Sequence, residues 1–224
     1  ASTEPVGREV SKKHAINSRL SATNPFIMGA ATKNSIKTSI LTNNVGPKMQ
    51  STNVTTNSDG TINVPFLYSP TNDDFKSFTV IDNNNDGKTW TYEKKKKALM
   101  YRYSVKEQAD DYVILPPIKI TDTNYMYTFS IDAAPSNDTY GESFEMCYGK
   151  SGDAASLQSI YSSGMIYGTT YSHYTAYFSA SEPGTYYVAV KATSPKNGWR
   201  LYVQNLAVEQ TQMKPTVPNM PTDI

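Results

Sequence analysis

The chain is poor in the residues that most often mark a catalytic, metal-bound or membrane protein. It has 224 residues but only one cysteine and two histidines. The single cysteine, Cys147, cannot form a disulfide within the chain, and the scarcity of cysteine and histidine gives little support to a zinc site. No run of about 18 apolar residues is present, so the sequence predicts no membrane span. The net charge is +1, which argues against nucleic acid as a partner.

The same scarcity argues against catalysis. A Ser-His-Asp triad needs a histidine held in place by its neighbours, whereas His14 lies in a weakly patterned region and His173 in the polar segment 169–174. No nucleophile-elbow pattern occurs. Cys147 lies in an alternating segment, which is typical of a buried, inert thiol. We therefore expect a protein that is not an enzyme.

What the chain does have is tyrosine, at 17 positions, and many short segments rich in β-branched and aromatic residues. From Ile62 onward, about ten such segments are separated by turns of Asn, Asp, Gly, Ser and Pro, and no long helical pattern appears. This spacing predicts an all-β fold, an antiparallel β-sandwich or barrel. Abundant Tyr, Thr, Ser and Asn with few charges suit a secreted or cell-surface protein.

The pattern divides the chain into three parts. Residues 1–61 are weakly patterned and are interpreted as an extension or as the remnant of a preceding module. Residues 62–210 hold the predicted strands. Residues 211–224 are rich in proline and are interpreted as a linker to a neighbouring module.

An acidic loop stands out between two of the predicted strands. Asp82, Asn84 and Asp86 place oxygen side chains at alternate positions, and Glu93 falls where an EF-hand loop has its last ligand. The flanking residues favour strands rather than helices, which excludes an EF-hand and carries Glu93 away from the loop. Two hypotheses remain, a calcium site completed by backbone carbonyls and water, or a turn whose side chains bond their own backbone.

Several motifs resemble the cleaved-adhesin (gingipain-adhesin) family of jelly-roll modules, found in Bacteroides-like bacteria. The motifs, which fall within about residues 62–210, are 78–82 (FTVID) with 86–90 (DGKTW), 109–118 (ADDYVILPPI), 142–145 (ESFE) with 148–151 (YGKS), 183–190 (PGTYYVAV) and 199–203 (WRLYV). The resemblance implies a jelly roll of galactose-binding-like or concanavalin-like type. It also implies a non-catalytic module that binds a host protein, a glycan or neighbouring modules, often with structural calcium.

Candidate site residues follow from these interpretations. The paired carboxylates at Asp73–Asp74 and Asp110–Asp111 repel each other unless a cation or donor lies between them, so Asp73 and Asp111 join Asp82, Asn84 and Asp86 as candidate calcium ligands. Tyr171, His173 and Tyr174 are candidate exposed ligand contacts, because aromatic faces stack on sugars and anchor interfaces. Half-buried strand tyrosines are the alternative. Trp90 and Trp199 are expected to pack inside the sandwich, and Lys94–Lys97 to form a solvated loop, with an acidic partner as the alternative.

Three functions are therefore open. The first is an adhesion or ligand-binding module of a longer surface protein. The second is a carbohydrate-binding module attached to a glycan-degrading enzyme, and the third is a structural spacer. Aromatic side chains exposed together on one face would favour a binding module over a spacer.

Overall fold

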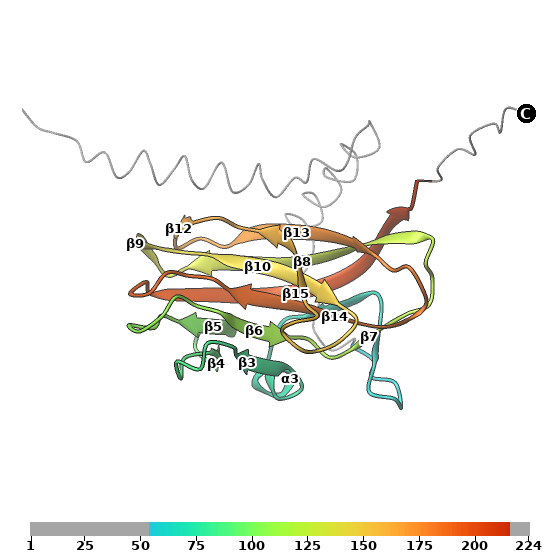
Figure 1. The fold of residues 1–224 in the computed structure, drawn as a ribbon, viewed down its shortest axis with the longest axis horizontal. Coiled ribbons are helices and arrows are strands. Elements are labelled where there is room, and N and C mark those ends of the chain that lie inside the picture. Colours follow the sequence, from blue (N-terminus) through green and yellow to red (C-terminus); the bar gives the residue numbers. More distant parts are fainter. Residues whose placement is uncertain (1–53, 216–224) are drawn as a thin grey trace, which may run out of the picture.

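The structure, a computed structural model, describes residues 54–215, and these form a β-sandwich of two facing sheets (Figure 1). The interpretation of residues 1–61 as an extension or remnant therefore lies mostly outside the described residues, which include only its last part, 54–61. The seven-stranded sheet contains β1 (Ile62–Asn63), β3 (Thr79–Asp82), β6 (Asp111–Ile114), β7 (Ile118–Ile120), β10 (Phe144–Gly149), β11 (Gln158–Ser162) and β14 (Gly184–Ala192). The six-stranded sheet contains β2 (Phe66–Tyr68), β4 (Trp90–Glu93), β5 (Ala98–Arg102), β8 (Tyr125–Pro135), β13 (Ser172–Ser179) and β15 (Arg200–Met213).

Two smaller elements complete the fold. Strands β9 (Asn137–Glu142) and β12 (Ile166–Gly168) form a two-stranded sheet, and α3 (Asn72–Lys76) is a one-turn helix. The helix begins after Thr71, whose hydroxyl accepts the backbone N–H of Asp74 in a capping box. Within residues 54–215 no helix is long and apolar enough to cross a membrane.

Each large sheet is organised around one long strand. In the seven-stranded sheet, β14 pairs with β10 on one side and with β6 and then β7 on the other. Pro116 and Pro117 separate β6 from β7, because proline has no N–H to donate to the ladder. In the six-stranded sheet, β15 pairs with β8 on one side and with β5 and then β2 on the other. Apart from the parallel β1–β7 pair, the named strands in these sheets pair antiparallel, which confirms the predicted fold class.

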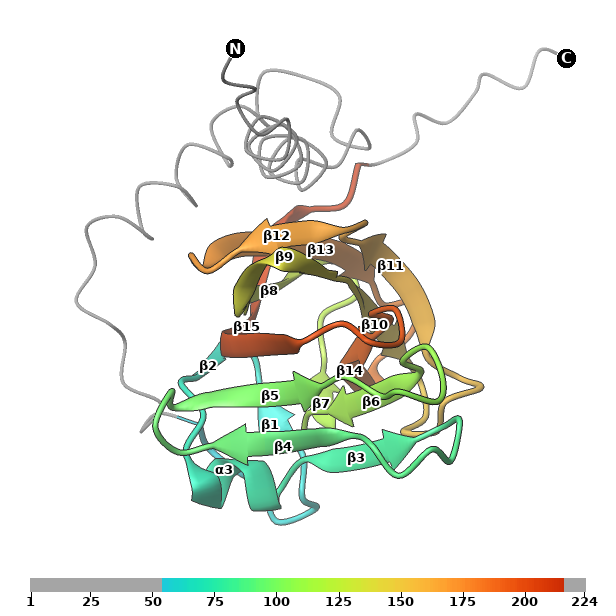
Figure 2. The ribbon, with the colours of Figure 1, turned by 90° about the vertical axis from the view of Figure 1, so that its left-hand side faces the viewer.

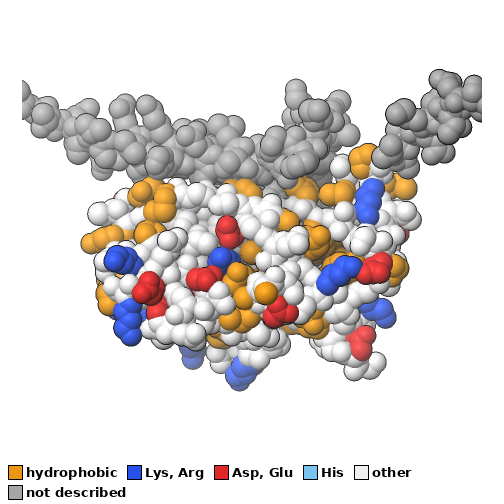
Figure 3. Space-filling model, in the orientation of Figure 1, with side chains coloured by type: hydrophobic (Ala, Val, Ile, Leu, Met, Phe, Trp, Pro, Cys, Tyr) orange, Lys and Arg blue, Asp and Glu red, His pale blue; other side chains and the backbone are white. Residues whose placement is uncertain are grey.

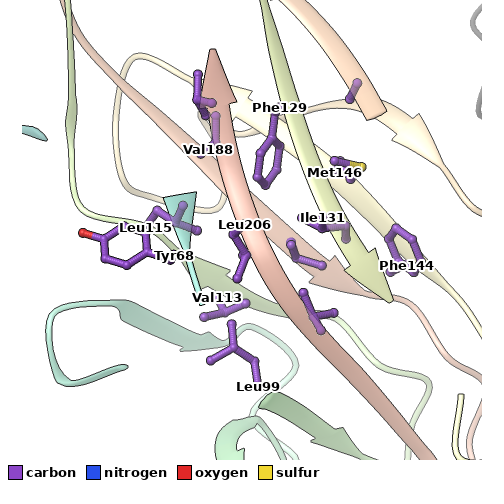
Figure 4. Close-up of a cluster of buried hydrophobic side chains, with 14 of the residues drawn as sticks. Tyr68, Leu99, Val113, Leu115, Phe129, Ile131, Phe144, Met146, Val188 and Leu206 are labelled. Atoms are coloured by element: carbon purple, nitrogen blue, oxygen red, sulfur yellow. The ribbon is translucent and has the colours of Figure 1, made fainter. Parts of the chain in front are cut away.

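The core lies between the two sheets (Figure 4). Alternate residues of β8 point inward, so that Tyr127, Phe129 and Ile131 are almost completely buried. They meet side chains of the facing sheet such as Met146 and Val188, which are also fully buried. Full burial of each large apolar side chain contributes about 1.5–3 kcal/mol, so this contact between the sheets is the main source of stability.

Cys147 belongs to a second, smaller cluster. Its side chain lies with Tyr112, Ile114, Leu157 and Ala189 rather than in the main core. The thiol is buried and free, and burial raises its pKa to about 12. The prediction of a buried thiol is therefore confirmed, and a thiol with this pKa is a poor nucleophile at neutral pH.

The sequence predicts that the sandwich ends at residue 210, but this position lies inside strand β15. Strand β15 continues to Met213, and its last residues pair with the start of β8. Residues 211–213 are therefore part of the sheet and not of a linker, because this ladder continues to the Met213–Tyr125 pair.

Candidate functional site

Most of the residues that could bind a ligand or a metal ion lie at one end of the sandwich. The strand registers place a set of connections together at this end, and Figure 2 views the molecule from it. These connections are residues 83–89, 103–110, 136–143, 163–171 and 193–199. Loops on a rigid sandwich are common places for binding residues.

The acidic loop crosses from one sheet to the other. It leaves β3 at Asp82 and enters β4 at Trp90, but β3 pairs with β6 while β4 pairs with β5. The predicted strand flanks are confirmed, and the loop is a crossover rather than a hairpin. Glu93 lies at the far end of β4, where its carboxylate accepts the N–H of Lys95 at 3.2 Å. Glu93 therefore lies away from the acidic loop, which confirms the expectation from the strand flanks.

Side chains of the loop hold its backbone in shape. The Asp82 carboxylate accepts the N–H groups of Asp86 and Gly87, at 3.2 and 2.9 Å. Oδ1 of Asp86 accepts the N–H of Lys88 at 2.7 Å. Gly87 has φ +80°, in the left-handed region that glycine adopts most easily. The Asx-type turn considered from the sequence is thus present.

Asp111 brings a second carboxylate to the same place. It lies directly opposite Asp82 in the β3–β6 register and is completely buried. The pKa of the Asp111 carboxyl is raised to about 7, mainly by burial and also by the nearby charges of Asp82 and Asp86, against a lowering by the N–H of Asp110. The direct pairing of Asp82 with Asp111 could not be predicted, because a register between distant strands cannot be derived from local sequence pattern.

Three buried oxygens in this region have neither a hydrogen-bond nor an ion-pair partner within the described residues. They are Oδ2 of Asp86, Oγ1 of Thr89 and Oδ1 of Asp111. The Thr89 hydroxyl is close enough to lower the pKa of Asp111, but its geometry falls short of a hydrogen bond. A buried carboxylate oxygen without a hydrogen-bond partner is costly, so these oxygens favour a bound proton or cation.

The donor set suits a hard cation that takes few protein carboxylates. Among residues 54–215, no group of three or more His, Cys, Asp or Glu side chains has the arrangement of a metal centre. Asp86 and Asp111 could supply two carboxylates, with Thr89 and loop carbonyls as neutral oxygens, which fits the mixed ligands that Ca²⁺ accepts. Asp82 and Asn84 serve mainly to shape the loop, since both accept backbone N–H groups.

Asp73 lies in the first turn of α3, where it forms an exposed ion pair with Lys76 at 2.9 Å. No hydrogen bond or ion pair joins it to the acidic loop within the described residues. The structure therefore gives no support to grouping Asp73 with the other candidate ligands.

The three predicted ligand contacts are separated by strand alternation. Tyr174 is 2% exposed and packs edge-on against Phe144 in the core, so the expectation that it is exposed is wrong. His173 faces the other way, and its Nδ1 lies 2.7 Å from Oδ1 of Asp132. Tyr171 is half-buried, and burial raises its pKa to about 12. The segment read as a polar turn contains the start of β13, so neighbouring residues point to opposite faces.

A row of three stacked aromatic rings lies at the loop end. Trp199 stacks on Tyr103, with ring centroids 5.5 Å apart and planes 19° apart, and on Tyr140, at 6.2 Å and 25°. Tyr140 is 45% exposed, while the other two rings are half-buried. We call Tyr103, Trp199 and Tyr140 the aromatic row. The expectation that both tryptophans pack inside holds for Trp90, which is 2% exposed, and fails for Trp199.

A buried carboxylate holds the aromatic row in place. Glu142 is fully buried, and its Oε1 accepts the N–H of Trp199 at 2.6 Å. Burial raises the pKa of Glu142, while hydrogen bonds from Ser194 and Trp199 lower it. A Cβ on Gly198 would lie only 3.2 Å from Oε1, so glycine permits this close approach. The sequence offered the Gly198–Trp199 pair in a turn as a signal, but the role of Trp199 depends on its long-range contacts with Glu142, Tyr103 and Tyr140.

Hydrogen bonds connect the acidic loop to the neighbouring loops. The side-chain amide of Asn84 donates to the carbonyl of Gln108 at 2.8 Å, and the Gln108 amide donates to the carbonyl of Thr193 at 3.0 Å. The N–H of Asn197 then donates to the carbonyl of Ser104 at 2.8 Å. A change in the conformation of the acidic loop can therefore alter the conformation of the segments that carry Tyr103 and Trp199.

Charged side chains elsewhere on the described surface include a run of lysines and, on one face, a mixture of both signs. Lys94–Lys97 form the exposed turn between β4 and β5, as expected for a solvated loop. On the face formed by β6, β10 and β14, charged side chains of both signs are scattered among uncharged groups (Figure 3). This surface lacks the basic stripe typical of nucleic-acid binding.

Comparison with known proteins gives structural matches only. No family model and no curated protein matches the sequence. The K3 cleaved adhesin domain of Lys-gingipain from Porphyromonas gingivalis W83 is 13% identical, covers 63% of this chain and 91% of its own, and has a TM-score of 0.47. The K2 cleaved adhesin domain of Lys-gingipain is 14% identical, with coverages of 67% and 99% and a TM-score of 0.49.

A xylan-binding domain is also similar. The CBM22-1 domain of Paenibacillus barcinonensis Xyn10C is 8% identical, covers 66% of this chain and 95% of its own, and has a TM-score of 0.43. Cleaved adhesin domains, the family that the sequence motifs resemble, are therefore among the solved structures that match. At identities this low a shared ligand does not follow.

Proposed function

We propose that this chain is a non-catalytic binding module of a secreted or cell-surface protein, and that it binds a saccharide through the aromatic row. The observation that carries the proposal is the row itself, in which Tyr103, Trp199 and Tyr140 stack at one loop end. Flat aromatic faces held in a fixed arrangement stack well on sugar rings. A structural spacer has no need of such a surface.

The groups with perturbed pKa values do not offer a competing catalytic site. Asp111 has the raised pKa that a general acid needs, but it is completely buried and has no surface to present to a substrate. The Cys147 thiol is buried as well, with its pKa raised to about 12. Binding is therefore the function that these side chains support.

We propose further that Ca²⁺ binds in the acidic loop through Asp86 and Asp111. The support is the set of buried oxygens without hydrogen-bond partners at Asp86, Thr89 and Asp111. A bound cation would balance the two carboxylates and fix the crossover between the sheets. Since Asn84 connects this loop to Gln108, the cation would also steady the loops beside the aromatic row.

The saccharide proposal is tested by replacing the most exposed ring of the row. Tyr140→Ala should weaken binding to the best glycan of an array by about tenfold, since aromatic stacking on a ligand is worth about 1 kcal/mol or more. Tyr177→Ala is the matched control, because Tyr177 lies on β13, away from the row. If Tyr177→Ala and not Tyr140→Ala abolishes binding, the site is on the sheet face and the proposal is wrong.

The calcium proposal is tested by thermal unfolding with and without a chelator. Ca²⁺ at 100 times its Kd would add about 2.7 kcal/mol, which is about 5–10 °C in Tm for a domain of this size. Asp86→Asn and Asp111→Asn should remove most of this shift, whereas Asp73→Asn, an exposed control, should keep it. An unchanged Tm of the wild-type protein in excess chelator would refute the proposal.

A further inference from the structure

Two arginines lie side by side next to the aromatic row. Arg200 on β15 and Arg102 on β5 are direct partners in the strand register. Their neighbours Leu201 and Tyr101 are buried in the core, at 0% and 1% exposure. Because strand residues alternate between faces, both arginines point to the outer face of the six-stranded sheet.

Neither arginine has an acidic partner within the described part of the chain. The ion pairs found in residues 54–215 involve Lys76, Lys150, Lys191 and His173. The guanidinium groups lie near the row instead, with Cζ of Arg102 5.9 Å from the Tyr103 ring centroid and Cζ of Arg200 5.3 Å from that of Trp199.

This arrangement is unfavourable without a ligand. Like charges directly opposite each other on neighbouring strands destabilise a sheet. In addition, Nε of Arg200 is buried and has no hydrogen-bond partner. Glu142 forms no ion pair with either arginine among the described residues; it is fully buried, and its Oε1 accepts the backbone N–H of Trp199. An anion at this place would offset the repulsion.

We infer that the ligand of the aromatic row is an anionic saccharide, whose carboxylate or sulfate groups contact Arg102 and Arg200 while a sugar ring stacks on Tyr140. The inference rests on the proposed function and names its ligand class. Guanidinium groups bind carboxylates and sulfates in a forked geometry and keep their charge at every relevant pH. Tyr140 is the ring of the row that can stack on a sugar, because it is 45% exposed whereas Trp199 stacks on both of its neighbours.

The test measures binding of polygalacturonate, chondroitin sulfate, a neutral β-glucan and polyglutamate by titration calorimetry at two salt concentrations. The wild-type protein should bind at least one anionic glycan about tenfold or more tightly than the neutral one, and higher salt should weaken that binding. Arg102→Gln and Arg200→Gln should each lose about tenfold toward the anionic glycan.

The Lys variants at the same two positions keep the charge and should retain part of this affinity. Lys150→Gln serves as the control for general charge effects, since Lys150 pairs with the exposed Glu182 away from the row. Circular dichroism checks that each variant is folded.

The outcomes separate the inference from the proposed function. Equal binding of neutral and anionic glycans, lost in Tyr140→Ala, would overturn the inference and leave the proposed function standing. Binding of polyglutamate as tightly as of polygalacturonate would also overturn it, in favour of an acidic polypeptide. If Lys150→Gln weakens binding of the anionic glycan as much as Arg102→Gln does, the binding depends on the overall charge of the protein and the inference is also overturned. Failure to bind any glycan, on this panel or on an array, would refute the proposed function itself.

Discussion

Replacing Asp111 by asparagine should make the cation-free protein more stable at alkaline pH. Asp111 is completely buried, and burial first, then the charges of Asp82 and Asp86, raise its pKa from 3.8 to about 7. Below pH 4 the carboxyl is protonated in both the folded and the unfolded state. As the pH rises from 4 to 7, the unfolded state loses this proton first, so the free energy of unfolding falls.

The size of the effect follows from the shift in pKa. A difference of about 3 pH units between the two states corresponds to about 4 kcal/mol, which is the largest cost that Asp111 alone can impose above pH 7. Asparagine has nearly the same shape and carries no charge, so Asp111→Asn removes this cost. The hydrogen bond from the Asp110 N–H to Asp111 can be kept by the amide oxygen.

The assay is urea unfolding at 25 °C, in chelator, at pH values from 4.5 to 8.5. The difference between Asp111→Asn and the wild-type protein should be small at pH 4.5 and should grow toward about 2–4 kcal/mol at pH 8, in favour of the variant. Asp73→Asn, whose carboxylate is exposed, should follow the wild-type curve throughout. Parallel curves for wild type and Asp111→Asn would refute the account of Asp111 as a costly buried acid.

The other predictions concern the packing around the site and the core. Glu142→Gln should keep the hydrogen bond to the Trp199 N–H and leave a folded protein, whereas Glu142→Ala should lose about 1–3 kcal/mol in urea unfolding and weaken glycan binding, since it leaves that N–H without its acceptor. Phe129→Ala should cost about 3–5 kcal/mol in the same assay, because the ring is fully buried between the sheets; a loss below 1 kcal/mol would contradict the core described above. Cys147 should resist a thiol reagent at pH 8 in the folded protein and react once it is unfolded, so rapid labelling under native conditions would contradict its burial.

The predicted strands came from local chemistry, and the structure confirms those around the acidic loop. Residues 79–82 and 90–93 are rich in β-branched and aromatic side chains, which favour strands whatever lies beyond them. The alternation of inward and outward residues along a strand would place Tyr174 in the core, but the polar residues of segment 169–174 favour a turn. Once β13 begins at Ser172, Tyr174 faces the core and His173 the opposite side.

The composition of the site could not be predicted in the same way. Asp111 joins the acidic loop only because β6 lies beside β3 in one particular register, and Trp199 joins Tyr103 and Tyr140 only because three connections end together. Such contacts between distant segments depend on packing over the whole sheet. Local sequence could identify an acidic loop and several tyrosines, but not which of them meet.

The two parts of the loop end differ in how charge is balanced. At the acidic loop, Asp86 and Asp111 each have a buried oxygen without a hydrogen-bond partner among the described residues, and a proton or Ca²⁺ would satisfy it. At the aromatic row, Arg102 and Arg200 form no ion pair within residues 54–215, and the anionic ligand proposed above would balance their charge. The hydrogen bond from Asn84 to Gln108 lies between the two parts. If Ca²⁺ fixes the acidic loop, glycan affinity should therefore fall when Ca²⁺ is removed, even though the cation touches no ligand.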